Sequence, residues 1–152
     1  MLPCCVLGGS GFVGSRLVAR LANAGFSVTV PTRDPERFRH LRLLPTVRIV
    51  HADIHAPGVL VNLLRGADVA INLVGILNET GRDGAGFRRA HVDLTRRVIE
   101  ACAAAGVGQL VQVSALNAAD PDAAGASTSH YLRSKGEAEA LVRASGLRWT
   151  IL

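Results

Sequence analysis

Cys4-Cys5-Val6-Leu7-Gly8-Gly9-Ser10-Gly11-Phe12-Val13-Gly14 is the stretch of sequence that decides the fold. An apolar strand runs directly into a glycine-rich turn, and a helix with an apolar face begins near Gly11. Gly8 permits a tight turn, Gly11 leaves the backbone open to a ligand, and Gly14 lets the helix pack closely on the strand. Free N–H groups and the positive end of the helix dipole favour a bound phosphate here. The alternative interpretation is a plain glycine turn.

Strand and helix signals alternate along the rest of the chain. Strands are expected over about residues 2–7, 26–30, 47–50, 67–74, 109–114 and 147–152. Helices are expected over about residues 11–24, 35–44, 57–66, 86–105 and 129–145, and a loop over 115–128. This alternation predicts an α/β fold with a doubly wound parallel sheet (a Rossmann fold) in three α/β/α layers, ordered 3-2-1-4-5-6.

Composition and charge narrow the class of protein. The chain has 152 residues, of which 49% are hydrophobic but only 4% aromatic, so its core is expected to consist of small aliphatic side chains. The formal net charge is +5, and arginines gather in segments whose simplest interpretation is solvated helix faces. The sequence has no nucleic-acid-binding motif and no group of aromatic side chains on which bases could stack, so we expect no nucleic-acid partner. An acidic protein partner is the alternative that the charge leaves open. The arginines concerned are Arg37, Arg39, Arg42, Arg88, Arg89, Arg96 and Arg97.

Cysteine and histidine spacings argue against a metal or a disulfide framework. The three cysteines show neither the spacing of metal ligands nor that of a disulfide framework, which indicates a reducing compartment. His51, Asp53 and His55 alternate, but Pro57 ends the strand, so we expect no metal. The first strand follows the N-terminus directly, which leaves no room for a leader peptide, and no apolar run suits a membrane span.

The end of the second expected strand predicts which nucleotide the turn accepts. An acid at this position reads the ribose hydroxyl of NAD, whereas an arginine suits the 2′-phosphate of NADP. Thr32 and Arg33 stand here, and Asp34 is one residue late and better explained as a cap. We therefore expect NADP(H) rather than NAD(H), the alternative being that Arg33 is merely exposed. Asp53 and Ile54, after the third strand, are expected to border the adenine.

Two later segments complete the candidate site. Gly75 ends the fourth strand and would let the backbone pass close to a cofactor, beside Leu73 and Val74. Tyr131 and Lys135 share one helix face, where a nearby ammonium lowers the pKa of a phenol and prepares it for proton transfer. Ser114, at the end of the fifth strand, is placed to polarise a carbonyl beside that phenol. The alternative for this Tyr-x-x-x-Lys spacing is coincidence.

Together these features resemble the extended or atypical branch of the short-chain dehydrogenase/reductase superfamily. The resemblance narrows to the group that contains the NADPH-binding accessory subunit of respiratory complex I and its bacterial relatives. It rests on Gly8-x-x-Gly11-x-x-Gly14, Val30-Pro31-Thr32-Arg33, Asn72-Leu73-Val74-Gly75-Ile76-Leu77, Val113-Ser114-Ala115-Leu116-Asn117 and Ser129-His130-Tyr131-Leu132-Arg133-Ser134-Lys135.

The resemblance implies a set of roles. Ser114, Tyr131 and Lys135 take the catalytic positions. The expected cofactor-binding residues are Gly8, Ser10, Gly11, Phe12, Val13, Gly14, Thr32, Arg33, Asp53, Ile54, Leu73, Val74, Gly75, His91 and Lys135. It also implies a bacterial cytoplasmic location, peripheral to the membrane, and a protein partner in a respiratory or membrane-associated complex.

One departure from the superfamily keeps two functions open. His91 stands where many members carry an asparagine that supports a proton relay, so it either substitutes for that residue or simply packs there. The first hypothesis is an assembly subunit that holds a structural nucleotide. The second is an active oxidoreductase or sugar-nucleotide epimerase/dehydratase.

The chain ends within the sixth expected strand, which predicts an N-terminal fragment. Residues 1–152 would then form a single NAD(P)-binding Rossmann domain without its C-terminal substrate lobe. The truncated strand leaves an open sheet edge, which predicts pairing between copies of the chain.

Overall fold

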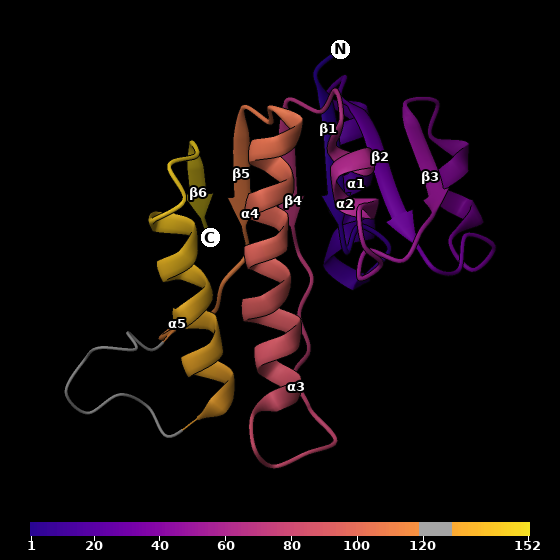
Figure 1. Cartoon of the computed structure of the whole chain (residues 1–152). Helices are drawn as coiled ribbons and strands as arrows, with labels where there is room; N and C mark the ends of the chain where they lie inside the picture. Colours follow the sequence, from indigo (N-terminus) through magenta and orange to yellow (C-terminus); the bar gives the residue numbers. More distant parts are fainter. Residues whose placement is uncertain (119–128) are drawn as a thin grey trace.

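The computed structural model describes residues 1–118 and 129–152 and contains one parallel sheet (Figure 1). Its six strands lie in the order β3-β2-β1-β4-β5-β6, as the sequence predicts. Sequential strands on each side of β1 are joined by crossovers, so the strand order reverses between β1 and β4, where doubly wound sheets bind ligands. The strands are β1 (Pro3–Leu7), β2 (Ser27–Thr32), β3 (Val47–His51), β4 (Val69–Asn72), β5 (Gln109–Gln112) and β6 (Trp149–Ile151).

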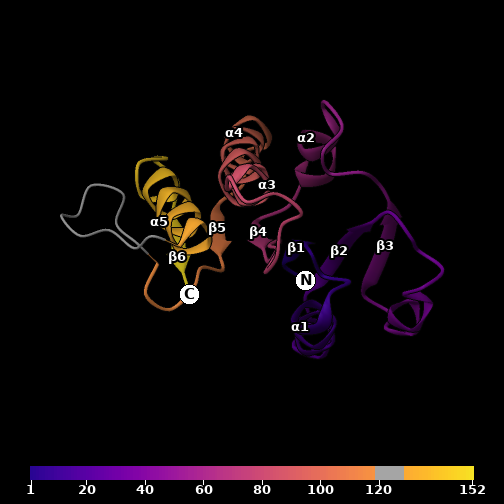
Figure 2. The ribbon, with the colours of Figure 1, turned by 90° about the horizontal axis from the view of Figure 1, so that it is seen from below.

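Helices cover both faces of the sheet (Figure 2). One face carries α1 (Phe12–Asn23) and the 3-10 helix η1 (Arg39–Leu43). The other carries α2 (Val59–Leu64), α4 (Leu94–Ala105) and α5 (His130–Arg143). The short helix α3 (Ala85–Phe87) and the π-helical turn η2 (Arg88–Asp93) run without a break into α4.

Alternation along β1 sends neighbouring side chains into different cores. Cys4 and Val6 pack toward α1 and η1, whereas Cys5 and Leu7 pack toward α2 and α4. All four are at most 2% exposed. A strand buried on both faces reads as a continuous apolar run, which explains why this segment shows no polar alternation.

Three expected helices differ in detail from the structure. Residues 35–38 form turns with i→i+3 hydrogen bonds, such as Phe38 N–H to Pro35 O at 3.3 Å, and lead into η1 rather than an α-helix. Gly58 adopts a left-handed conformation with φ of 73°, so α2 begins only after it. The expected helix over 86–105 contains the π-helical turn, and residues 119–128 of the expected loop lie outside the described residues.

Candidate functional site

Two cavities lie side by side along the carboxyl edge of the sheet, and both are lined by Gly8 and Val74. The first, called here the β2–β3 cavity, has a volume of about 350 Å³ and includes Thr32 and Asp53. The second, the β4–β5 cavity, has a volume of about 390 Å³ and includes Tyr131. A crevice at this edge is where open α/β sheets bind their ligands.

The glycine turn after β1 has the shape that the sequence predicts. Gly8 is left-handed, with φ of 78°, and its O accepts the Gly11 N–H at 2.9 Å. A Cβ on Gly14 would overlap the Gly8 carbonyl oxygen and lie 2.6 Å from the Gly9 Cα, so this glycine is required for packing. A Cβ on Gly11 would meet only the Gly8 O, at 3.2 Å, which leaves space in front of the helix.

The N-terminus of α1 has no acidic side chain that would compete with a bound anion for its free N–H groups. Its first turn contains no acidic residue, and Gly11 at the N-cap offers no side-chain acceptor to the free N–H groups. Phe12 and Val13 are 80% and 63% exposed and line the β4–β5 cavity. Ser10 lines the β2–β3 cavity. These groups suit an anion held between the two cavities.

Basic side chains line the end of β2. Arg33 lines the β2–β3 cavity and is exposed, with no hydrogen bond or ion pair among the described residues. Asp34 is engaged, since its Oδ1 accepts the Arg37 N–H at 3.2 Å. Arg37, which the sequence analysis did not assign to the site, also lines this cavity. The Thr32 Oγ1 accepts the Asp34 N–H at 3.3 Å and so shapes the turn.

The loop after β3 forms the opposite wall of the β2–β3 cavity. Asp53 and Ile54 both line it, where the sequence analysis placed an adenine. One carboxylate oxygen of Asp53 accepts the His55 N–H at 2.9 Å, so the side chain is held while its other oxygen remains available.

The β4–β5 cavity brings Ser114, Tyr131 and Lys135 together. The Ser114 Oγ is buried and finds no hydrogen-bond partner among the described residues, so it is available to a ligand. The Lys135 Nζ donates to the Val113 O at 2.7 Å. Burial lowers the pKa of Lys135, and the Glu139 carboxylate acts in the opposite direction. The cavity therefore contains an unpaired hydroxyl, a phenol and an amine.

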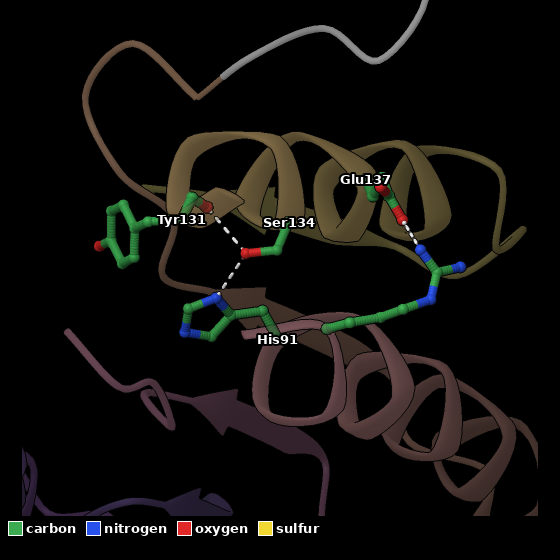
Figure 3. Close-up of polar contacts among 5 residues, drawn as sticks. His91, Tyr131, Ser134 and Glu137 are labelled. Carbon is green, nitrogen blue, oxygen red and sulfur yellow. Dashed lines mark hydrogen bonds and ion pairs between the residues drawn. The ribbon is translucent and has the colours of Figure 1, made fainter. Parts of the chain in front are cut away.

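His91 lines the same cavity, and both of its ring nitrogens are hydrogen-bonded; Figure 3 shows the bond to Ser134. Its Nε2 accepts the Ile76 N–H at 3.1 Å, so Nδ1 carries the proton and donates to the Ser134 Oγ at 2.8 Å. The Ser134 hydroxyl in turn donates to the backbone O of Tyr131 at 2.7 Å. Both ring nitrogens are thus engaged in positioning backbone, which favours packing over a relay for this residue. Burial, followed by the Lys135 charge, lowers the pKa of His91 to about 4.

The end of β4 is held by a buried amide pair. Asn72 and Gln112 are 1% and 2% exposed, and the Asn72 Nδ2 donates to the Gln112 Oε1 at 3.0 Å. The Asn72 Oδ1 accepts the Val74 N–H at 3.2 Å. Asn72 is therefore a satisfied strand-end amide, whereas Leu73, Val74 and Gly75 line the β4–β5 cavity.

Metal and membrane sites have no support among residues 1–118 and 129–152. No three His, Cys, Asp or Glu side chains gather there as metal ligands. In the same residues, no helix combines the length and apolar character that a membrane span needs.

Comparison with known proteins decides the family. A profile described as NAD(P)H-binding matches residues 8–152, which includes both cavities. This chain belongs to the NAD(P)H-binding family.

Curated relatives of this NAD(P)H-binding domain include both enzymes and subunits. Ceramide reductase of Caulobacter vibrioides is 36% identical over 143 residues, which are 92% of this chain and 41% of that protein. The mitochondrial NADH-ubiquinone oxidoreductase 40 kDa subunit of Neurospora crassa is 30% identical over 141 residues, 91% of this chain and 36% of that protein. The chain thus spans about two fifths of the length of these relatives.

Solved structures agree on the fold. MoeE5 in complex with UDP-glucose and NAD has a TM-score of 0.78 and 27% identity, over 98% of this chain and 52% of that one. UDP-glucuronic acid 4-epimerase from Bacillus cereus with NAD has a TM-score of 0.80 at 21% identity, over 99% of this chain and 55% of that one, and shows the fold alone. An uncharacterized sugar epimerase of Bacillus subtilis is 28% identical over 150 residues, 97% of this chain and 68% of that protein, so the domain is related to complex I accessory subunits, reductases and epimerases.

Sequence reasoning missed several residues that shape the site. Ser134 lies within the Tyr131–Lys135 motif, but no local pattern identified its partner His91, which is 43 residues away. Glu79 accepts the N–H groups of Gly84, Gly86 and Phe87 and so fixes the start of α3. A carboxylate before a glycine-rich helix start was the available signal.

Proposed function

We propose that this NAD(P)H-binding domain prefers NADP(H) to NAD(H). The observation that carries the proposal is Arg33, which lines the β2–β3 cavity at the end of β2 and whose guanidinium has no partner within residues 1–118 and 129–152. A guanidinium fits a 2′-phosphate, and the neighbouring acid Asp34 is occupied by the Arg37 N–H. Arg37 adds a second positive charge to the same cavity.

The remaining parts of the site fit the rest of the dinucleotide. The glycine turn and the N-terminus of α1 would hold the diphosphate, and the Asp53 carboxylate would accept from the adenine amino group. Lys135 would hold the nicotinamide ribose, beside Tyr131 and Ser114. When bound, the cofactor would supply or accept a hydride in the β4–β5 cavity.

We propose that the nucleotide serves a structural role in a larger, membrane-associated assembly. The 30% identical relative is a subunit of NADH-ubiquinone oxidoreductase, and His91 anchors backbone instead of offering a free ring nitrogen. The second candidate is a reductase or epimerase/dehydratase. Two observations favour it: the Ser114 hydroxyl, which has no hydrogen-bond partner in the described part of the chain, shares a cavity with Tyr131, and the ceramide reductase is 36% identical.

Calorimetric titration of NADPH and NADH into the chain tests the cofactor proposal. We expect NADPH to bind more tightly than NADH, and Arg33→Ala to weaken NADPH binding by about tenfold or more, with little effect on NADH. Arg39→Ala is the matched control, since Arg39 is exposed on η1 and lines neither cavity. Equal affinities of the wild-type chain for the two nucleotides would overturn the preference.

A further inference from the structure

We infer that Arg97, on α4, is a positioning residue for the adenine end of the proposed nucleotide site. This inference rests on the proposed function. Arg97 lines neither the β2–β3 nor the β4–β5 cavity, because it approaches the loop after β3 from the helix layer behind it. Its Nη2 lies 3.2 Å from the Ile54 O, 3.0 Å from the His55 O and 3.4 Å from the Ala56 O.

The loop itself explains why a cation is required at this point. Asp53 closes the turn twice, since its side chain accepts the His55 N–H at 2.9 Å and its backbone O accepts the Ala56 N–H at 3.0 Å. Because these N–H groups point into the turn, the carbonyl oxygens of Ile54, His55 and Ala56 all lie on the side of the loop that faces α4. Their dipoles repel one another unless a positive donor lies between them, and the Arg97 guanidinium supplies that donor.

The other side of the same loop is the wall of the β2–β3 cavity. Asp53, Ile54 and His55 all line it. Within the described part of the chain, Arg97 is the one side chain from outside residues 53–56 that hydrogen-bonds to this loop. Arg97 therefore sets the place of the Asp53 carboxylate without touching the nucleotide.

The chain provides a matched control one residue away. Arg96 has the same charge on the same helix but is exposed, with no hydrogen bond or ion pair among the described residues. We propose to compare Arg97→Met, Arg97→Lys and Arg96→Met with the wild-type chain by hydrogen exchange and by nucleotide binding. Circular dichroism would establish that each variant is folded.

Hydrogen exchange without nucleotide tests the contact directly. We expect the amides of residues 53–56 and of Gly58 to exchange at least tenfold faster in Arg97→Met than in Arg96→Met, with α5 unchanged. Arg97→Lys should lie between them, because an ammonium reaches fewer of the three carbonyls. Equal exchange in Arg97→Met and Arg96→Met would overturn the inference, and this readout holds even if the wild-type chain binds no nucleotide and the proposed function fails.

Binding tests the consequence for adenine. The probes are NADPH and its hypoxanthine analogue, which carries an oxygen where adenine has the amino group. We expect the wild-type chain to prefer NADPH, and Arg97→Met to bind NADPH about tenfold more weakly while losing most of the preference. A general loss of stability would lower the affinity for NADPH and for its hypoxanthine analogue equally. If Arg97→Met keeps the wild-type preference, the inference fails although the proposed function stands.

Discussion

His91 and Ser134 are joined by a 2.8 Å hydrogen bond although 43 residues separate them in the sequence. The bond connects the π-helical turn η2 to α5, and the Ile76 N–H at the other ring nitrogen adds the loop after β4. A neutral imidazole is required, because a proton on Nε2 would face the Ile76 N–H donor. This requirement makes the stability of the site sensitive to acid.

Stability should fall as the pH drops from about 6.5 to about 4. The folded chain holds the pKa of His91 near 4, while the unfolded chain takes up a proton near pH 6.5. Because folding lowers this pKa, neutral His91 makes its full contribution to the free energy of unfolding above pH 6.5. That contribution, about 3 kcal/mol, is lost progressively between pH 6.5 and pH 4. Chemical denaturation at a series of pH values measures this. In His91→Gln the free energy of unfolding should no longer fall in this way between pH 6.5 and pH 4, whereas the control His51→Gln, at an exposed position, should show the same fall as the wild-type chain.

Two glycines of the phosphate turn should separate folding from binding. Gly14→Ala should lower the free energy of unfolding by about 1–3 kcal/mol, because its Cβ would overlap the Gly8 carbonyl. Gly11→Ala should change stability far less but weaken NADPH binding, since its Cβ would occupy the open space in front of α1. Urea titration and calorimetry measure the two effects. A stable Gly14→Ala would show that the turn can relax.

Tyr131→Phe should distinguish the two proposed roles of the nucleotide. The substitution removes only the hydroxyl, so we expect NADPH to bind as before. If the chain, within its whole protein, reduces a carbonyl, turnover should fall by about 10²–10⁴-fold. Hydride transfer from stereospecifically deuterated NADPH is the measurement. Undiminished turnover in Tyr131→Phe would remove the phenol from the reaction.

Asn72→Ala should be among the more damaging substitutions in the sheet. It would leave the buried Gln112 Oε1 and the Val74 N–H without their hydrogen-bond partners, which costs about 2–3 kcal/mol. The double variant Asn72→Leu/Gln112→Leu should recover part of that loss, because it removes both buried amide groups. Thermal unfolding of the single and double variants tests this. Additive losses would show that the two amides are independent.

Much of the fold follows from local patterns. The run from Cys4 to Leu7 is apolar on both faces, and a glycine turn follows it, so a buried parallel strand and its order in the sheet were predictable. Residues that follow the strands gather at the carboxyl edge of the sheet, which is why Arg33, Asp53 and Ser114 were predicted at the site, whereas Tyr131 was predicted from its helical spacing to Lys135. Their roles in binding and turnover stay predictions.

The rest depends on contacts that no local pattern contains. Arg97 was interpreted as part of a solvated basic face, yet its guanidinium lies behind the loop after β3. Arg88 pairs with Glu137 on α5 at 2.9 Å (Figure 3). The expected helix at 35–44 failed because i→i+3 bonds satisfy Phe38 and Arg39 before an α-helix begins.

The π-helical turn gives its segment one residue to spare. A π-turn contains one residue more than an α-turn, so deleting one residue of Arg88–Asp93 would restore ordinary winding and leave the helix before and after it facing the same way. A deletion within α4 would instead rotate everything before it by about 100° around the helix axis and turn His91 away from Ser134, with which it shares a 2.8 Å hydrogen bond. Single-residue deletions among natural variants of the chain should therefore fall in the π-helical turn far more often than in α4.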